Sequence, residues 1–121
     1  MQGLAAAGGS ARGTTLGSGV VFALHRDVDL GALLARLARF FREESCGQCV
    51  PCRVGTVRQH ELVTRLRRGS PHGDRDEELA RFAELSQAMR DASICGLGQT
   101  ASSAIESAIT RLGAFQDDPP R

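Results

Sequence analysis

The sequence of 121 residues contains no lysine, tryptophan or tyrosine, and its only aromatic residues are five phenylalanines. So few aromatic side chains leave little bulk to fill a core, and a chain of this length buries only about 60–70% of the surface that its unfolded form exposes. A bound metal centre or a partner surface is therefore expected to supplement the core. The length also argues against a dinucleotide-binding fold together with a substrate domain, because each commonly needs on the order of 100 residues.

Long apolar runs are also missing. The run from Val20 to Leu24 is far shorter than the ~20 residues that a membrane-spanning helix needs. The first seven residues lack the basic and apolar regions of a secretory signal. We therefore expect a cytoplasmic chain without direct membrane insertion, peripheral to the inner membrane only through its partners. Four cysteines in such a reducing compartment indicate metal or redox chemistry before disulfides.

Neither sign of charge dominates, because fifteen arginines face fourteen acidic residues and the formal net charge is +1. This balance gives no reason to expect nucleic-acid binding. The two signs are unevenly distributed: ten arginines and five acids precede Gly69 (net +5), and five arginines and nine acids follow from there (net −4). The asymmetry is compatible with a docking surface and with two solvated faces.

The pattern of apolar residues predicts a short β segment followed by helices. Residues 1–19 are rich in Gly, Ala, Ser and Thr and are typical of a loop-bearing lead-in, and Val20–Leu24 reads as one short strand. From Leu30 onward the apolar spacing is helical. Four helices are predicted: one from Leu30 with Asp29 as its N-cap, one from about Val54 to Arg68, one from about Asp76 to Asp91, and one from near Thr100 to a C-cap at Gly113.

The predicted fold is therefore mostly α: a small four-helix bundle preceded by a short Gly-rich β segment. Three parts are expected along the chain. These are a lead-in over 1–29 that holds the strand, a helical domain over 30–115 and a tail over 116–121.

The four cysteines carry the clearest chemical signal. Cys46, Cys49 and Cys52 form C-x2-C-x2-C, and Cys95 follows after two predicted helices. Three thiolates on one tight loop and a distant fourth are the pattern of a cysteine-bound four-iron cluster. Gly47 permits a close backbone approach, and Pro51 is expected to keep the chain from becoming helical before Cys52.

Two other uses of the cysteines remain open at this point. A structural zinc site usually presents two separated pairs of cysteines, whereas this chain has three and one. Two disulfides agree with the count but not with a reducing compartment. The spacing favours the iron–sulfur cluster over both.

A longer string around the cysteines resembles a known family. Residues 44–55, E-S-C-G-Q-C-V-P-C-R-V-G, resemble the signature of the flavoprotein subunit of NADH:quinone oxidoreductase (respiratory complex I). The same signature occurs in the diaphorase subunits of NAD-dependent formate dehydrogenases and bidirectional hydrogenases. Residues 16–21, L-G-S-G-V-V, resemble the segment that ends the family's β-grasp-like region, and residues 93–98, S-I-C-G-L-G, resemble its second cysteine motif.

The resemblance implies that Cys46, Cys49, Cys52 and Cys95 ligate one [4Fe-4S] cluster in the helical domain, and that residues 1–29 are the remnant of the β-grasp-like region. It implies an electron-transfer subunit that relays electrons between a flavin site and further iron–sulfur clusters. A flavin-bearing chain and another iron–sulfur subunit of an oxidoreductase complex are the expected partners. The alternative is a zinc-stabilised four-cysteine scaffold without a redox role.

No catalytic residue is predicted, because a relay cluster needs no acid, base or nucleophile. The chain also lacks the family's FMN and NADH loops. Its nearest glycine pattern, Gly17-Ser18-Gly19, has no third glycine and precedes a strand, so it fails as a dinucleotide fingerprint. Arg53 directly follows the cysteine loop and is either a residue that raises the cluster potential or a surface arginine.

Overall fold

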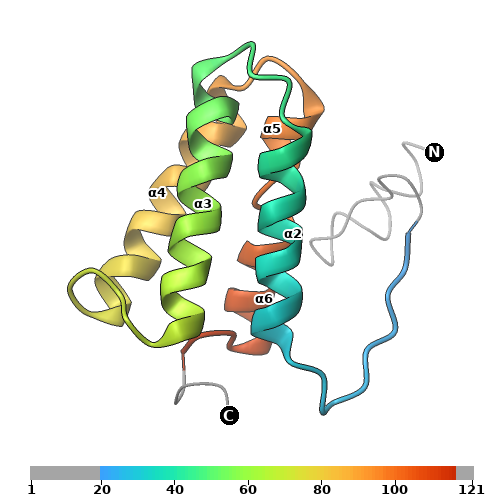
Figure 1. Cartoon of the computed structure of the whole chain (residues 1–121), viewed down its shortest axis with the longest axis vertical. Coiled ribbons are helices and arrows are strands. Elements are labelled where there is room, and N and C mark those ends of the chain that lie inside the picture. Colours follow the sequence, from blue (N-terminus) through green and yellow to red (C-terminus); the bar gives the residue numbers. More distant parts are fainter. Residues whose placement is uncertain (1–19, 117–121) are drawn as a thin grey trace.

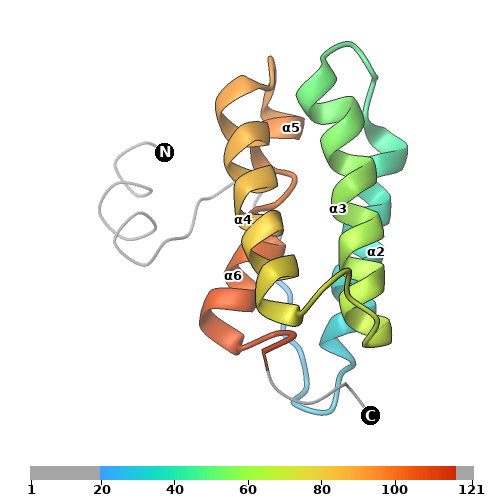
Figure 2. The same ribbon diagram turned by 90° about the vertical axis from the view of Figure 1, so that its left-hand side faces the viewer.

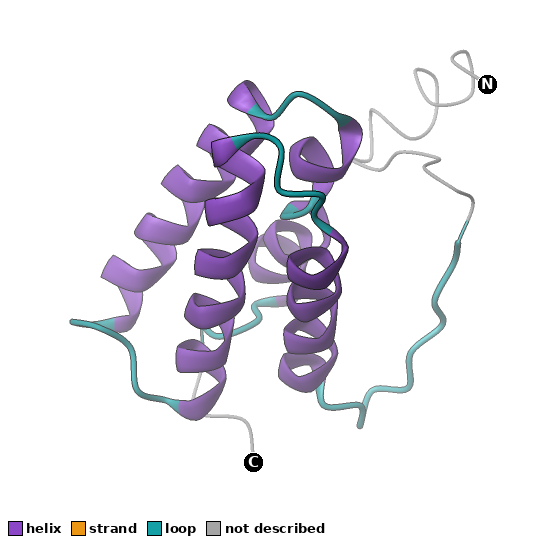
Figure 3. Cartoon of the chain, turned by 45° about the horizontal axis from the view of Figure 1, so that its top comes forward, coloured by secondary structure: helices purple, strands orange, loops and turns teal. Residues whose placement is uncertain are grey.

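The computed structural model describes residues 20–116, in which five helices are joined by loops. They are α2 (Leu30–Glu44), α3 (Val50–Arg68), α4 (Arg75–Ala92), the short α5 (Gly96–Thr100) and α6 (Ser103–Leu112). The predicted mostly α fold is confirmed, and Figure 3 shows only helices and loops in this part of the chain. The lead-in over 1–19 and residues 117–121 of the tail lie outside the described residues, and the three-part division stays a prediction.

Local sequence signals fix most helix ends. The Asp29 side chain accepts a hydrogen bond of 2.8 Å from the Ala32 N–H at the start of α2, as an N-cap should. Asp74 and Glu77 form a complete capping box at the start of α4. Gly69 and Gly113 end α3 and α6 in the left-handed conformation, at φ 69° and 65°. The predicted cap at Asp29, the predicted end of the second helix at Arg68 and the predicted C-cap at Gly113 are confirmed.

The four longer helices pack as an antiparallel bundle. In Figure 1, α2 and α4 rise toward one end, while α3 and α6 descend from it. Figure 2 shows α3 and α2 on one side of the bundle and α4 and α6 on the other. All four helices and the segment after α6 contribute to one core, made by Leu34, Ala38, Leu62, Val63, Leu66, Phe82, Ile105, Ala108, Ile109 and Phe115.

This arrangement brings two loops together. The loop between α2 and α3 and the loop between α4 and α5 both lie at the upper end of the bundle in Figure 1. None of the helices within residues 20–116 has the length and the apolar character needed to cross a bilayer.

The predicted strand at Val20–Leu24 is wrong, because these residues have no regular secondary structure. Val21 and Phe22 are largely exposed, at 89% and 68%. A strand requires hydrogen bonds to a neighbouring strand, and the described part of the chain offers none. The β-prone composition is therefore not sufficient here.

Two predicted helix boundaries are also corrected. The second helix starts at Val50 instead of about Val54. Pro51 lies in its first turn, where backbone N–H groups have no partner within the helix, so the proline costs no hydrogen bond. Cys52 therefore lies within the helix, not before it. The predicted fourth helix, from near Thr100, corresponds to α6, which starts at Ser103, and the residues directly after Cys95 form the additional short helix α5.

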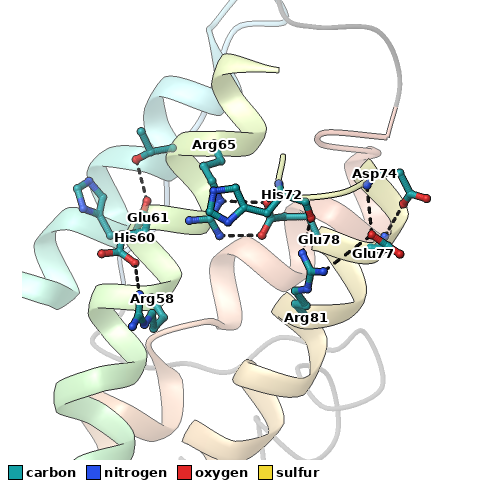
Figure 4. A network of polar contacts seen from close by, with 10 residues as sticks. Arg58, His60, Glu61, Arg65, His72, Asp74, Glu77, Glu78 and Arg81 are labelled. Atoms are coloured by element: carbon teal, nitrogen blue, oxygen red, sulfur yellow. Dashed lines mark hydrogen bonds and ion pairs between the residues drawn. The ribbon is translucent and has the colours of Figure 1, made fainter. Parts of the chain in front are cut away.

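The end of the bundle away from the two loops is held by a buried carboxylate. Glu78 on α4 is fully buried and accepts two hydrogen bonds from the Arg65 guanidinium on α3, at 3.0 and 2.7 Å. It also accepts one of 2.7 Å from the His72 N–H. Figure 4 shows these groups converging on the Glu78 carboxylate. The predicted third helix begins one residue earlier than expected, at Arg75, and this network ties its first turn to α3.

Candidate metal centre

All four cysteines line one cavity of about 160 Å³ between the two upper loops. Glu44, Ser45, Gly47, Gln48, Ile94 and Leu97 complete its wall. Cys52 is buried, Cys49 is half-buried, and Cys46 and Cys95 are exposed. The structure thus brings together every residue that the sequence predicts for the site, with none of the four in a disulfide.

Helix starts position three of the four thiols. Cys49 is the N-cap of α3, Cys95 is the N-cap of α5, and Cys52 lies in the first turn of α3. The N-terminus of the 19-residue α3 carries a partial positive charge, which favours thiolates and other anionic groups beside it. The site is therefore electrostatically suited to a negatively charged group.

Three hydrogen bonds fix the first cysteine loop, which is the loop 45–49 between α2 and α3. The Gly47 N–H donates to Ser45 Oγ at 3.3 Å, and Ser45 Oγ lies 3.2 Å from Cys52 Sγ. Arg53 Nη1 donates to the Gly47 carbonyl oxygen at 2.8 Å. Gly47 has φ +78°, a conformation that favours glycine. Arg53 therefore braces the loop backbone, a role that sequence reasoning did not foresee.

The segment carrying Cys95 reaches the first loop through close packing at Gly98. A Cβ atom at this position would lie 2.3 Å from Ser93 Oγ and 2.9 Å from Cys52 Cβ. Real Cβ atoms do not approach other atoms so closely, so only glycine lets α5 lie against Cys52.

We predict that Gly98→Ala lowers the stability of the metal-free protein by about 1–3 kcal/mol, because α5 must move away from Cys52. Urea unfolding measures this loss. Gly96→Ala is the matched control, since a Cβ there meets no atom within 4 Å. Equal stability of the two variants would contradict the packing role of Gly98.

The Cys49 thiol is the one cysteine of the site with a distinct pKa shift. The Ile94 backbone N–H is the main cause that lowers the pKa of Cys49. The Cys52 backbone N–H adds to this lowering. The thiolate of the first loop is thus stabilised by the segment that precedes Cys95.

The residues present fit a polynuclear group better than a single ion. Around one tetrahedral zinc, with Zn–S near 2.3 Å, the sulfur atoms would be about 3.8 Å apart. No three His, Cys, Asp or Glu side chains among residues 20–116 are grouped to hold one metal ion. The cavity that the four cysteines line with their neighbours has about 160 Å³, whereas one water needs roughly 10–15 Å³.

Sequence reasoning missed three residues of the site. Ser45 and Ser93 flank the cysteines, and Gly98 sets the contact between the loops. The motifs themselves contain these residues, in E-S-C, S-I-C and C-G-L-G, but only the packing reveals what they touch. None of the histidines lines the cavity, and His60 lies instead beside Arg42, with Nδ1 and Nη1 3.2 Å apart.

A helical bundle with four thiols that line one cavity fits the class of small iron–sulfur-binding domains. Comparison with protein families agrees. Residues 32–118 match the family described as the NADH-ubiquinone oxidoreductase-F iron-sulfur binding region, and the chain belongs to this family. Its cofactor is a [4Fe-4S] cluster, and the four-thiol cavity fits that group.

Two relatives from other organisms are similar to this protein over most of its chain. It is 34% identical over 94 residues to the mitochondrial NADH dehydrogenase (ubiquinone) flavoprotein 1 of Dictyostelium discoideum, covering 78% of the chain and 19% of that protein. It is 35% identical over 85 residues to the NADP-reducing hydrogenase subunit HndC of Solidesulfovibrio fructosivorans, covering 70% and 17%.

A solved structure gives the same picture. A chain of the NAD⁺-reducing [NiFe]-hydrogenase in the H₂-reduced state matches with a TM-score of 0.68 and 34% identity, over 76% of this chain and 16% of that one. The chain thus spans about a fifth of the length of the relatives that it matches.

Proposed function

We propose that the chain is an electron-transfer module in which Cys46, Cys49, Cys52 and Cys95 bind one [4Fe-4S] cluster. The module relays electrons between a flavin site and further iron–sulfur clusters of a multisubunit oxidoreductase of the NADH dehydrogenase, formate dehydrogenase or hydrogenase type. The observation that carries the proposal is the convergence of all four cysteines on one cavity. We propose that the module works in the cytoplasm and is held at the membrane only through its partners.

When bound, a [4Fe-4S] cluster supplies one-electron transfer without bond chemistry at the protein. The residues of the chain therefore have to hold and orient the ligands. Buried Cys52 is fixed by α3 and by Ser45, and the N-terminus of α3 favours the negative charge of the ligand set. No side chain of the site is assigned an acid, base or nucleophilic role.

Exposed apolar side chains beside the cavity support a partner surface there. Ile94, which lines the cavity, is 71% exposed, and Val50, next to Cys49, is 59% exposed. Apolar groups exposed in this way commonly mark a protein interface. Since two thiols at the rim are also exposed, we propose that a flavin-bearing partner or another iron–sulfur subunit docks at this end.

Anaerobic purification followed by metal and sulfide analysis tests the proposal. We expect a brown protein with about four irons and four labile sulfides per chain, and an electron paramagnetic resonance signal after reduction by dithionite. A colourless protein with one tightly bound zinc would overturn the proposal in favour of a scaffold. Copurified proteins, identified by mass spectrometry, test the proposed flavin-bearing and iron–sulfur partners.

A further inference from the structure

One buried hydroxyl next to the cavity has no hydrogen-bond partner. Ser93 is only 5% exposed at the C-cap of α4. Its N–H donates to the Met89 carbonyl at 3.2 Å, and its carbonyl accepts from Gln99 Nε2 at 3.0 Å. The Ser93 hydroxyl oxygen, in contrast to these backbone groups, has no hydrogen-bond partner among the described residues. Because burial removes such a group from water, its retention calls for an explanation.

The position of Ser93 indicates what the hydroxyl serves. It directly precedes Ile94 and Cys95, both of which line the cavity. Ser93 Oγ and Cys52 Cβ approach the same point beside Gly98, 2.3 and 2.9 Å from where a Cβ would lie. The hydroxyl is thus packed beside the innermost of the four cysteines.

A second serine approaches the same cysteine from the other loop. Ser45 Oγ lies 3.2 Å from Cys52 Sγ. Because the Gly47 N–H already donates to Ser45 Oγ, the hydroxyl proton of Ser45 is free to point at the sulfur. Each cysteine loop therefore supplies one serine hydroxyl near Cys52.

We propose that the hydroxyls of Ser45 and Ser93 donate hydrogen bonds to the sulfur atoms of the cluster and its cysteine ligands and thereby raise its reduction potential. The inference rests on the proposed function and deepens it. A hydrogen bond to sulfur stabilises the reduced form more, because that form carries more negative charge. Ser45 and Ser93 are positioning residues that act through sulfur and do not bind iron.

The test is an anaerobic redox titration of the full chain and its variants, monitored by electron paramagnetic resonance. Ser93→Ala is expected to lower the ratio of reduced to oxidised protein about fivefold at a fixed potential, the effect of one hydrogen bond. Ser45→Ala should do the same, and Ser45→Thr, which keeps the hydroxyl, should restore the wild-type ratio.

Ser86→Ala is the matched control. Ser86 Oγ on α4 is also buried and without a hydrogen-bond partner among the described residues, but neither neighbour of Ser86 in the chain lines the cavity, whereas Ile94 beside Ser93 does. Its removal should leave the ratio at the wild-type value. As a second readout, electron–nuclear double resonance in H₂O and D₂O should detect an exchangeable proton coupled to the cluster that Ser93→Ala removes.

The outcomes separate the two proposals. A wild-type chain without about four irons refutes the proposed function, and this inference with it. If the wild-type chain holds a full cluster, the proposed function stands. The inference alone is then refuted if Ser93→Ala leaves the ratio of reduced to oxidised protein unchanged, or if Ser86→Ala lowers this ratio as much as Ser93→Ala does. If Ser93→Ala does not fold, the comparison of Ser45→Ala with Ser45→Thr decides, and equal ratios in these two variants overturn the role of the hydroxyls.

Discussion

Cys95→Ala is expected to lower the content of four-iron cluster by at least about tenfold. Loss of a residue that only hydrogen-bonds to a metal ligand already lowers metal affinity by about tenfold or more, and loss of a ligand itself should cost at least as much. Since Cys95 is exposed, the substitution removes a thiol without disturbing the core. Iron and sulfide analysis after anaerobic reconstitution gives the cluster content. Circular dichroism is expected to show an unchanged helical content.

Gln48→Ala is the matched control for the loss of Cys95. Gln48 is exposed and lines the same cavity, but its amide is not a ligand of iron–sulfur clusters. Its variant should retain about four irons per chain. An unchanged iron content in Cys95→Ala, or an equal loss in Gln48→Ala, would rule out Cys95 as the fourth ligand.

Glu78→Gln is expected to lower the free energy of unfolding at pH 7 by about 2–3 kcal/mol. Removing one member of a buried ion pair leaves the other uncompensated, at a cost of about 3–5 kcal/mol. The loss expected for Glu78→Gln is smaller than this cost because the Arg65 side chain is 25% exposed and water can partly solvate it. Urea unfolding measures the difference. Glu84→Gln, an exposed acid on the same helix, should stay within about 0.5 kcal/mol of the wild type.

The same pair predicts how stability depends on pH. The Arg65 guanidinium is the main cause that lowers the pKa of Glu78 from its ordinary value of 4.5, and the His72 N–H adds to the effect. A carboxyl with a lowered pKa in the folded state stabilises the fold above its ordinary pKa. This stabilisation is lost as the pH falls through the folded-state value. The stability gap between wild type and Glu78→Gln should therefore narrow below about pH 4.5, and a constant gap would argue against an ionised Glu78.

Much of the bundle is predictable because its helices carry local signals. The cap at Asp29, the glycine stops and the spacing of apolar residues act over one or two turns, and the structure follows them. The convergence of the cysteines on one cavity also agrees with their spacing in the sequence.

The remaining features depend on contacts that are distant in the sequence. The run Val20–Leu24 has strand propensity but finds no partner strand in the described residues. Glu78 reads as a surface acid in the first turn of a helix, yet it is buried against Arg65, thirteen residues earlier in the chain. Likewise, no local pattern predicts that Gly98 lets α5 approach Cys52. Packing decides each of these, and propensity does not.

Cys52 and Cys95 are far apart in the sequence but line the same cavity, so a group bound there links cluster content to the lifetime of the protein. A group bonded to both Cys52 and Cys95 closes a loop of about 40 residues, which by chain entropy destabilises the unfolded state by about 4 kcal/mol. Total stabilities of domains are about 5–15 kcal/mol, so this restraint is a large share. Oxidative loss of the group would free the loop and raise the population of opened chains, on which proteases act. A damaged module would then be degraded in preference to an intact one.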